Sequence, residues 1–122
     1  MTDIKCFDSS AWLSYYFSQN SVVKSMIDSH GLILTSSLSL FEIKKRMLNL
    51  KKDPEPLLIF MKQRSVIIMP TIEINEKAAE IAVKNKLGAM DSLIYTTSRM
   101  HEAELVTGDN DFRNIDNVKI IS

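Results

Sequence analysis

The stretch Ile4-Lys-Cys-Phe7 is a short apolar run, and one acidic residue and two serines, Asp8-Ser9-Ser10, follow it at once. Similar apolar runs follow at Leu32-Ile-Leu34, Val66-Ile-Ile-Met69, Leu105-Val-Thr107 and Val118-Lys-Ile-Ile121. These runs are rich in β-branched residues and do not alternate polar with apolar positions. They therefore predict four or five strands that are buried on both faces.

Longer segments of helical period separate these runs, and each segment carries one apolar stripe. The stripes consist of Leu40, Ile43, Met47 and Leu50, ending near Asp53-Pro54; of Ala79, Ala82, Val83 and Leu87, ending at Gly88; and of Met90, Leu93, Ile94 and Thr97. Strands that alternate with helices predict an α/β fold with a central, mainly parallel sheet covered on both faces.

Length and composition exclude several classes of protein. The 122 residues suit a single domain over residues 1–122, and 15 Lys and Arg residues balance 15 Asp and Glu residues, which excludes a strongly basic coat protein. The single cysteine, Cys6, excludes an internal disulfide and a cysteine-based zinc site. The charged amino terminus and the lack of an apolar run near ~20 residues predict a soluble, cytoplasmic protein that does not interact with membranes.

Acidic residues stand where strands end or helices begin. Asp8 follows the first run, Asp109 and Asp111 follow Leu105-Val-Thr107, and Glu42 and Asp91 lie near predicted helix starts. In open α/β sheets, ligands bind outside the carboxyl ends of the strands. We therefore expect several carboxylates at one edge of the sheet.

Each of these acids also has an ordinary structural interpretation. Asp8 can cap a helix that opens at Ser9, and Ser39-x-x-Glu42 has the form of a capping box, with Arg46 one turn further on as a partner for Glu42. Asp91 can be a first-turn acid that the helix dipole stabilises, and Asp109-Asn-Asp111 can be an Asx-type turn. Considered one at a time, none of these acids can be assigned to a structural role or to a catalytic one.

Taken together, the acids favour a metal site. Clustered carboxylates repel one another, and ionised acids are costly in a medium of low dielectric constant. A hard divalent cation removes this cost, and a ligand set made only of oxygen atoms favours Mg²⁺ or Mn²⁺. Such ions with open coordination positions typically serve phosphoryl chemistry, in which they polarise a phosphate and activate a water.

Four segments of the chain, in order, resemble the PIN-domain family, in particular its VapC-type toxins. The segments are Ile4-Lys-Cys-Phe-Asp8-Ser-Ser-Ala-Trp12, Leu38-Ser-Leu-Phe-Glu42-Ile, Ala89-Met-Asp91-Ser-Leu-Ile94 and Leu105-Val-Thr-Gly-Asp109-Asn-Asp111-Phe112. Two departures from the family pattern, Ser92 and Gly108, remove no acid. The resemblance implies a three-layer α/β/α sandwich and a metal-dependent endoribonuclease that hydrolyses RNA phosphodiester bonds.

The resemblance also implies roles for individual residues. Asp8, Glu42, Asp91 and Asp109 match the family's four catalytic acids, and Asp111 matches a position that assists the site. The implied metal ligands are Asp8, Asp91, Asp109 and Asp111, and the implied cofactor is Mg²⁺ or Mn²⁺. Ser9 or Ser10 and Thr107 match hydroxyl residues that hydrogen-bond the carboxylates.

Basic residues gather in the middle of the chain. Between Lys44 and Arg64 there are seven basic residues and two acidic ones. We expect Lys44, Lys45, Arg46, Lys51 and Lys52 to attract RNA phosphates toward the acidic site. A solvated helical face explains the same residues equally well.

Aromatic residues in the first predicted helix suggest a partner. Ala11, Trp12, Tyr15 and Tyr16 share one face, and Leu13 and Phe17 share another. One of these faces can enter the core, whereas the face around Trp12, Tyr15 and Tyr16 predicts a homodimer or an antitoxin interface. A large core that absorbs both faces is the competing interpretation.

The resulting hypothesis is a toxin ribonuclease that a cognate antitoxin inhibits. The alternatives are a PIN-domain nuclease of RNA maturation or quality control, and an inert PIN module that binds RNA or protein without cutting. A phosphoacceptor receiver domain is disfavoured, because the run Val66-Ile-Ile-Met69 leads into Pro70 rather than into an acid.

Overall fold

The chain folds around one parallel sheet, seen in a computed structural model that describes residues 3–121. The strand order is β3-β2-β1-β4-β5, and each of the four neighbouring pairs is parallel. The strands are β1 (Lys5–Phe7), β2 (Ile33–Ser36), β3 (Val66–Ile68), β4 (Glu104–Thr107) and β5 (Val118–Ile120). The prediction of a parallel sheet in an α/β fold is confirmed.

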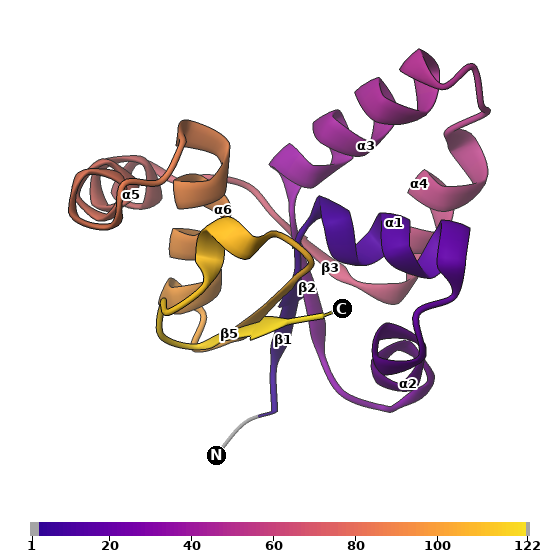
Figure 1. Ribbon diagram of the computed structural model, residues 1–122, viewed down its shortest axis with the longest axis horizontal. Coiled ribbons are helices and arrows are strands. Elements are labelled where there is room, and N and C mark those ends of the chain that lie inside the picture. Colours follow the sequence, from indigo (N-terminus) through magenta and orange to yellow (C-terminus); the bar gives the residue numbers. More distant parts are fainter. Residues whose placement is uncertain (1–2, 122) are drawn as a thin grey trace.

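Helices cover both faces of this sheet. Figure 1 shows α1, α2, α3 and α4 on one side of the strands and α5 and α6 on the other. The predicted three-layer sandwich is therefore confirmed. The helices are α1 (Ser9–Ser18), α2 (Ser21–Asp28), α3 (Ser37–Asn49), α4 (Glu55–Arg64), α5 (Ile72–Asn85) and α6 (Ala89–Met100).

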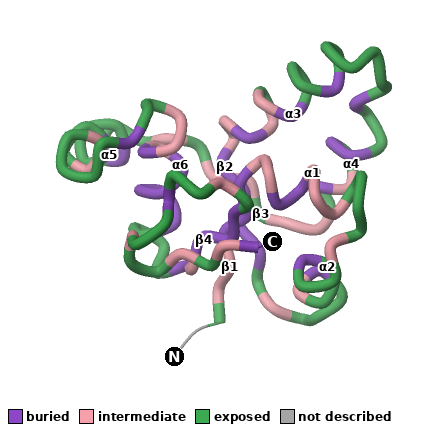
Figure 2. The backbone as a smooth tube through the Cα atoms, in the orientation of Figure 1, coloured by how far each residue is buried: buried purple, intermediate pink, exposed green. Residues whose placement is uncertain are grey.

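Two apolar layers separate the helices from the sheet, because successive residues of a strand point to opposite faces. In β1, Phe7 packs into the layer under α1–α4, whereas Cys6 packs into the layer under α5 and α6. Val106 and Leu105 of β4 divide between the two layers in the same way. The buried backbone accordingly gathers along the central strands in Figure 2.

Burial on both faces holds for the central strands only. β1, β2 and β4 are largely buried, but Val66 at the start of β3 is 48% exposed and the middle residue of β5 is exposed. The reason is their position at the sheet edges, where helices cover the strands incompletely. β2 also includes the buried polar residues Thr35 and Ser36, because their hydroxyls have hydrogen-bond partners. The Thr35 hydroxyl bonds to Trp12 and Ser65, and the Ser36 hydroxyl accepts from the N–H of Leu38.

The apolar stripe predicted on α5 is wrong at Ala79 and Val83, which are exposed, although Leu87 just beyond the helix is buried as predicted. Ile74 and Ala78 form the buried side of this helix, whereas Val83 is 83% exposed. The helix is apolar on two sides, and its packing against α6 decided which side is buried. Its end is also misplaced in the prediction, because Lys86 adopts the left-handed conformation and Gly88 is instead the N-cap of α6.

The end of α3 also differs from the prediction. The helix stops at Asn49 rather than near Pro54, and Lys51 takes a left-handed conformation with φ of 57°. Leu50, predicted to belong to the apolar stripe, is 45% exposed because it lies beyond the last helical turn.

The aromatic face predicted on α1 is divided by the core. Trp12 is fully buried, and its indole N–H donates to the Thr35 hydroxyl at 3.1 Å. Tyr15 is partly buried and stacks on Phe60 of α4. Trp12 and Tyr15 therefore do not form a free partner surface, and among these aromatics only Tyr16 and Phe17 are exposed.

The chain reverses its direction of travel across the sheet between β1 and β4. From β1 it proceeds through β2 to β3, and it then crosses back to β4 on the other side of β1. This switch lies at the carboxyl ends of β1 and β4, and sheets of this kind bind ligands in the crevice at such a point. Within residues 3–121, none of the helices has the length and apolar character needed to cross a membrane.

Candidate metal centre

Acidic side chains from four separate elements surround this crevice. Asp8 directly follows β1 and serves as the N-cap of α1, and Asp109 lies just beyond β4. Asp91 lies in the first turn of α6, and Glu42 lies in α3. Parallel strands end at a common edge, so residues distant in the sequence come together there.

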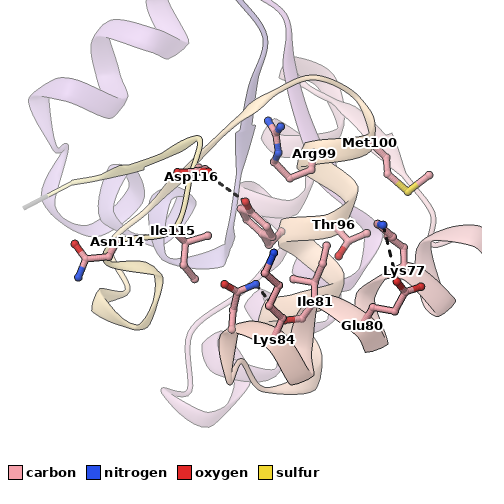
Figure 3. Close-up of a pocket in the computed structure, with 12 residues that line it drawn as sticks. Lys77, Glu80, Ile81, Lys84, Thr96, Arg99, Met100, Asn114, Ile115 and Asp116 are labelled. Atoms are coloured by element: carbon pink, nitrogen blue, oxygen red, sulfur yellow. Dashed lines mark hydrogen bonds and ion pairs between the residues drawn. The ribbon is translucent and has the colours of Figure 1, made fainter.

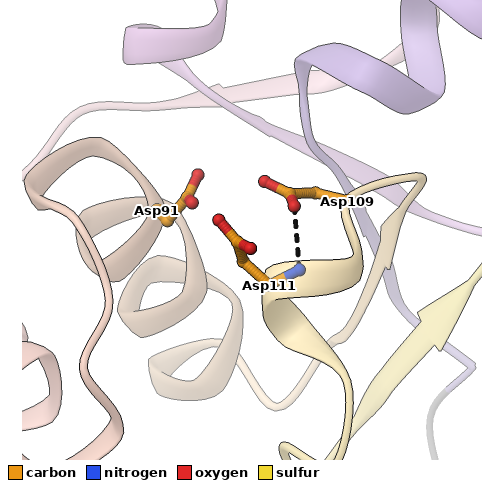
Figure 4. Close-up of side chains that lie close together, drawn as sticks. All are labelled: Asp91, Asp109 and Asp111. Atoms are coloured by element: carbon orange, nitrogen blue, oxygen red, sulfur yellow. Dashed lines mark hydrogen bonds between the residues drawn. The ribbon is translucent and has the colours of Figure 1, made fainter.

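Three carboxylates form the centre of the cluster. Oxygen atoms of Asp91, Asp109 and Asp111 all lie within 4.8 Å of one another. Figure 4 shows Asp91 reaching from α6 toward the turn that carries Asp109 and Asp111. Asp109 fixes this turn, because its Oδ1 accepts a hydrogen bond from the Asp111 N–H at 2.9 Å and caps the short 3₁₀ helix Asn110–Phe112.

Asp8 lies beneath this cluster, almost entirely buried and surrounded by donors. Its carboxylate accepts hydrogen bonds from the Ser10 hydroxyl at 2.6 Å, the Ala11 N–H at 3.0 Å and the Thr107 hydroxyl. Burial raises the pKa of Asp8 above its usual value, although these hydrogen bonds oppose the rise. The hydroxyls of Ser10 and Thr107 thus couple the end of β1 to the end of β4.

Glu42 belongs to the same neighbourhood and does not form the predicted capping box. Its Oε1 accepts a hydrogen bond from the Ser9 hydroxyl at 2.7 Å, which links α3 to α1. The N-cap of α3 is Ser36, and the buried hydroxyl of Ser39 has no hydrogen-bond partner among the described residues. The ion pair between Glu42 and Arg46 is likewise not found within residues 3–121.

The electrostatics of the cluster are clearest at Asp91. Burial, followed by the charges of Asp109, Asp8, Glu42 and Asp111 in that order, raises the pKa of Asp91 to about 6. The charges of the other four acids therefore all act on Asp91. Cys6 cannot contribute a thiolate ligand, because burial, followed by the charge of Asp8, raises the pKa of its thiol to about 12.

The structure brings most of the predicted metal ligands together. Asp91, Asp109 and Asp111 have oxygens close enough to share one ion, whereas Asp8 is not in this group and contributes charge from beneath it. Two of the structural roles expected for these acids are also observed. Asp8 does cap α1, and Asp109 does form an Asx-type turn, so capping and clustering occur in the same side chains.

The predicted RNA-binding cations have different surroundings in the structure. All five are exposed, but only Lys45 and Arg46 line a cavity that also includes Ser9, Ser10 and Glu42. Lys52 lies instead over the Phe17 ring. Arg64 has a structural position, because it donates to the carbonyl oxygens of Met26, Ile27, Ser29 and Gly31.

Sequence reasoning missed Phe41, whose side chain lines the same cavity and is 62% exposed. Its signal was its place directly before Glu42, at one helical turn from Lys45. An apolar residue inside a predicted helix is normally assigned to the core, and for this reason it was overlooked.

A larger cavity of about 660 Å³ lies away from the carboxylates, between α5, α6 and residues 114–116 (Figure 3). It contains none of the predicted site residues. In it Tyr95 donates a hydrogen bond to the Asp116 carbonyl, and Lys77 pairs with Glu80. Because the clustered acids lie elsewhere, this cavity is not the candidate metal centre.

Comparison with known proteins relates this architecture to one family. A family model for the PIN domain matches residues 5–118. No match to a curated protein sequence was found.

Solved structures with the same fold match the chain over nearly its whole length. A toxin–antitoxin complex from Klebsiella pneumoniae has a TM-score of 0.80 at 19% identity, covering 94% of this chain and 95% of that one. VapBC2 from Rickettsia felis, bound to a DNA fragment from its promoter, has a TM-score of 0.82 at 18% identity, covering 98% and 99%. VapC20 from Mycobacterium tuberculosis, a toxin that cleaves the sarcin–ricin loop, has a TM-score of 0.72 at 14% identity, covering 97% and 99%.

Proposed function

This chain belongs to the PIN-domain family, and from that premise we propose that it is a divalent-metal-dependent endoribonuclease that acts as the toxin of a toxin–antitoxin pair. The observation that carries the proposal is the group of Asp91, Asp109 and Asp111, whose oxygens lie within 4.8 Å of one another. The similarity to toxin–antitoxin structures over nearly the full chain supports the biological role.

The residues present fit Mg²⁺ or Mn²⁺. The donor set consists of carboxylate oxygens, which hard divalent cations prefer, and the like charges that raise the pKa of Asp91 need a cation to offset them. Asp91, Asp109 and Asp111 would hold the ion, with Asp8 adding charge and a further oxygen from beneath. When bound, such an ion polarises a phosphate and lowers the pKa of a water.

The chain's own residues orient this centre. Ser10 and Thr107 hold the Asp8 carboxylate by hydrogen bonds, and the Asp111 N–H holds that of Asp109. The Ser9 hydroxyl binds one oxygen of Glu42, which leaves the other oxygen to accept a hydrogen bond from an attacking water. In this proposal Asp8, Glu42, Asp91 and Asp109 are the catalytic acids, and Ser9, Ser10 and Thr107 are positioning residues.

The substrate in this proposal is RNA, attracted by cations beside the acids. Lys45 and Arg46 line the cavity next to Glu42, and Lys44, Lys51 and Lys52 are exposed nearby in the sequence. Because the carboxylates repel phosphates, these cations would offset that repulsion and increase the rate of encounter with RNA.

The protein partner in this proposal is an antitoxin, and a second copy of the chain is the other candidate. Tyr16 and Phe17 of α1 are 41% and 46% exposed, which leaves an aromatic surface at the end of that helix. Substituting both with serine should weaken capture of the antitoxin and lower the mass measured by light scattering. Unchanged capture and mass would place both interfaces elsewhere.

Cleavage of single-stranded RNA tests the activity. We expect purified protein to cut RNA with Mg²⁺ or Mn²⁺ and to lose this activity in excess chelator, because carboxylates and hydroxyls alone do not activate a water well. Asp109→Asn should abolish cutting, whereas Glu76→Gln on the exposed side of α5 should leave it unchanged. Efficient cleavage in excess chelator would refute the metal-dependent mechanism.

Further measurements separate the toxin from its alternatives. A toxin should arrest growth when expressed alone, and co-expression of a small antitoxin encoded directly upstream should restore growth. A nuclease of RNA maturation or quality control should cut a defined precursor without such rescue. An inert PIN module should bind RNA or protein and show no metal-dependent cleavage.

A further inference from the structure

A second surface adjoins the carboxylates on the side of α3. It is a cavity of about 430 Å³ between α1, α3 and the start of α6, and this volume lies within the range of about 300–1,000 Å³ found for small-molecule sites. Ser9, Ser10 and Glu42 line it on the side of the candidate metal centre. Phe41, Lys45 and Arg46 line it along α3.

The Phe41 ring is exposed at this cavity without a structural reason. It is 62% exposed, and within residues 3–121 no aromatic ring packs against it. Burial of a phenylalanine side chain is worth about 1.5–3 kcal/mol, so the ring does not contribute its full stabilising effect to the folded chain. A flat apolar surface at a cavity rim is suited to stacking against another flat group.

The two cations beside this ring are also unpaired. Lys45 follows Phe41 by one helical turn, and neither Lys45 nor Arg46 lies within 4.0 Å of a carboxylate oxygen among the described residues. An exposed ring with adjacent free cations is the combination with which proteins bind single-stranded nucleic acid. Here it directly adjoins the acids proposed to cut the phosphodiester chain.

We propose that this cavity is a nucleobase subsite, in which the Phe41 ring stacks on the base of a nucleotide next to the scissile phosphate while Lys45 and Arg46 bind a neighbouring phosphate. The inference rests on the proposed ribonuclease function. It adds a residue, Phe41, that positions the nucleotide next to the scissile phosphate. An RNA strand fits this site better than a peptide segment of a partner protein, because the unpaired cations Lys45 and Arg46 attract phosphates and the exposed ring can stack on a base.

A cycle that combines a protein change with an RNA change tests the contact. Binding is measured in the inactive Asp91→Asn background with Mg²⁺, using single-stranded oligonucleotides that span a mapped cut site. One nucleotide at a time is replaced by fluorescent 2-aminopurine or by an abasic residue. We expect 2-aminopurine to be quenched at one position next to the cut, and Phe41→Leu to remove that quenching.

The affinities give the decisive comparison. Phe41→Leu should weaken binding of the intact oligonucleotide about 10- to 100-fold, the range of one base stacked on an aromatic ring. It should have no further effect on the oligonucleotide that is abasic at the quenched position. Phe41→Trp should retain binding, and Leu48→Ala, an exposed apolar residue of α3 outside the cavity, should change nothing.

Other outcomes overturn the proposal. If the effects of Phe41→Leu and base removal add, or if Phe41→Leu leaves RNA affinity unchanged, the ring does not stack on a base. If Phe41→Leu weakens only the binding of a co-purified antitoxin, the cavity is a peptide site. If wild-type protein cleaves RNA but the Asp91→Asn protein shows no quenching at any position, only the subsite is refuted. Absence of any cleavage by wild-type protein refutes the proposed function together with the subsite.

Discussion

Asp91 is the residue at which the chemistry and the stability of this protein are most directly opposed. Its first-turn position in α6 is favourable for an acid because the helix dipole stabilises negative charge. Its burial and its four acidic neighbours act in the other direction and raise its pKa to about 6. The raised pKa shows that burial, together with the charges of these neighbours, outweighs the dipole.

This balance predicts that Asp91→Asn raises the melting temperature of the metal-free protein at pH 7.5. A rise of about two pKa units corresponds to about 3 kcal/mol, and solvent screening at this half-buried side chain reduces the expected gain to about 1 kcal/mol. Thermal melts in excess chelator measure the effect. A lower melting temperature for the variant would show that the dipole is the larger effect.

The same pKa sets the pH dependence. Because the folded-state pKa of Asp91 lies above the unfolded value, the folded protein binds more protons between about pH 4 and pH 6, and stability falls as pH rises through that window. The stability difference between Asp91→Asn and the wild type should therefore shrink from pH 7.5 to pH 5. Glu73→Gln, which removes an exposed first-turn acid of α5, should show no such gain.

At the scale of elements, Arg64 joins three segments of the chain. It ends α4, and its guanidinium donates to the carbonyl oxygens of Ile27 at 2.9 Å, Ser29 at 3.1 Å and Gly31 at 3.1 Å. These carbonyls belong to the end of α2 and to the turn before β2. One side chain thereby fixes the entry of the chain into the central sheet.

We expect Arg64→Met to lower the free energy of unfolding by about 2 kcal/mol, because carbonyl groups lose a charged donor while the apolar stem is kept. Urea titrations measure this change. Arg64→Lys should recover only part of the loss, since an ammonium group cannot reach three carbonyls with the geometry of a guanidinium. Equal stability of all three proteins would mean that water replaces the guanidinium at no cost.

At the scale of the whole molecule, metal binding should be coupled to folding. The acids that would hold Mg²⁺ come from the turn that follows β4 and from α6, so they come together only in the folded chain. A ligand bound by the folded state alone stabilises it by mass action, by about 2.7 kcal/mol at a free concentration of 100 times Kd.

Thermal melts should therefore show a rise in melting temperature with added Mg²⁺ for the wild type. The rise should be smaller for Asp109→Asn and unchanged for Glu76→Gln. Wild-type curves that do not move over the whole range of Mg²⁺ concentration would contradict a metal site at these carboxylates.

The sequence by itself determined the succession of strands and helices and the acids that follow them. Apolar runs such as Ile4-Lys-Cys-Phe7 are too short and too continuous for surface helices, and an acid that directly follows a strand must lie at its carboxyl end. Asp8 and Asp109 could therefore be assigned to one sheet edge before any tertiary contact was known. These properties depend on near neighbours along the chain, which the sequence contains.

The tertiary structure alone decided which faces are buried and which acids converge. α5 offers two apolar sides and buries the one around Ile74, and α1 places Trp12 in the core although it shares a face with the exposed Tyr16. Asp111 joined the group of three close carboxylates while Asp8 stayed outside this group, because hydroxyls of Ser10 and Thr107 hold Asp8 in place. Such choices depend on the free energy of packing between segments distant in sequence, which no local pattern contains.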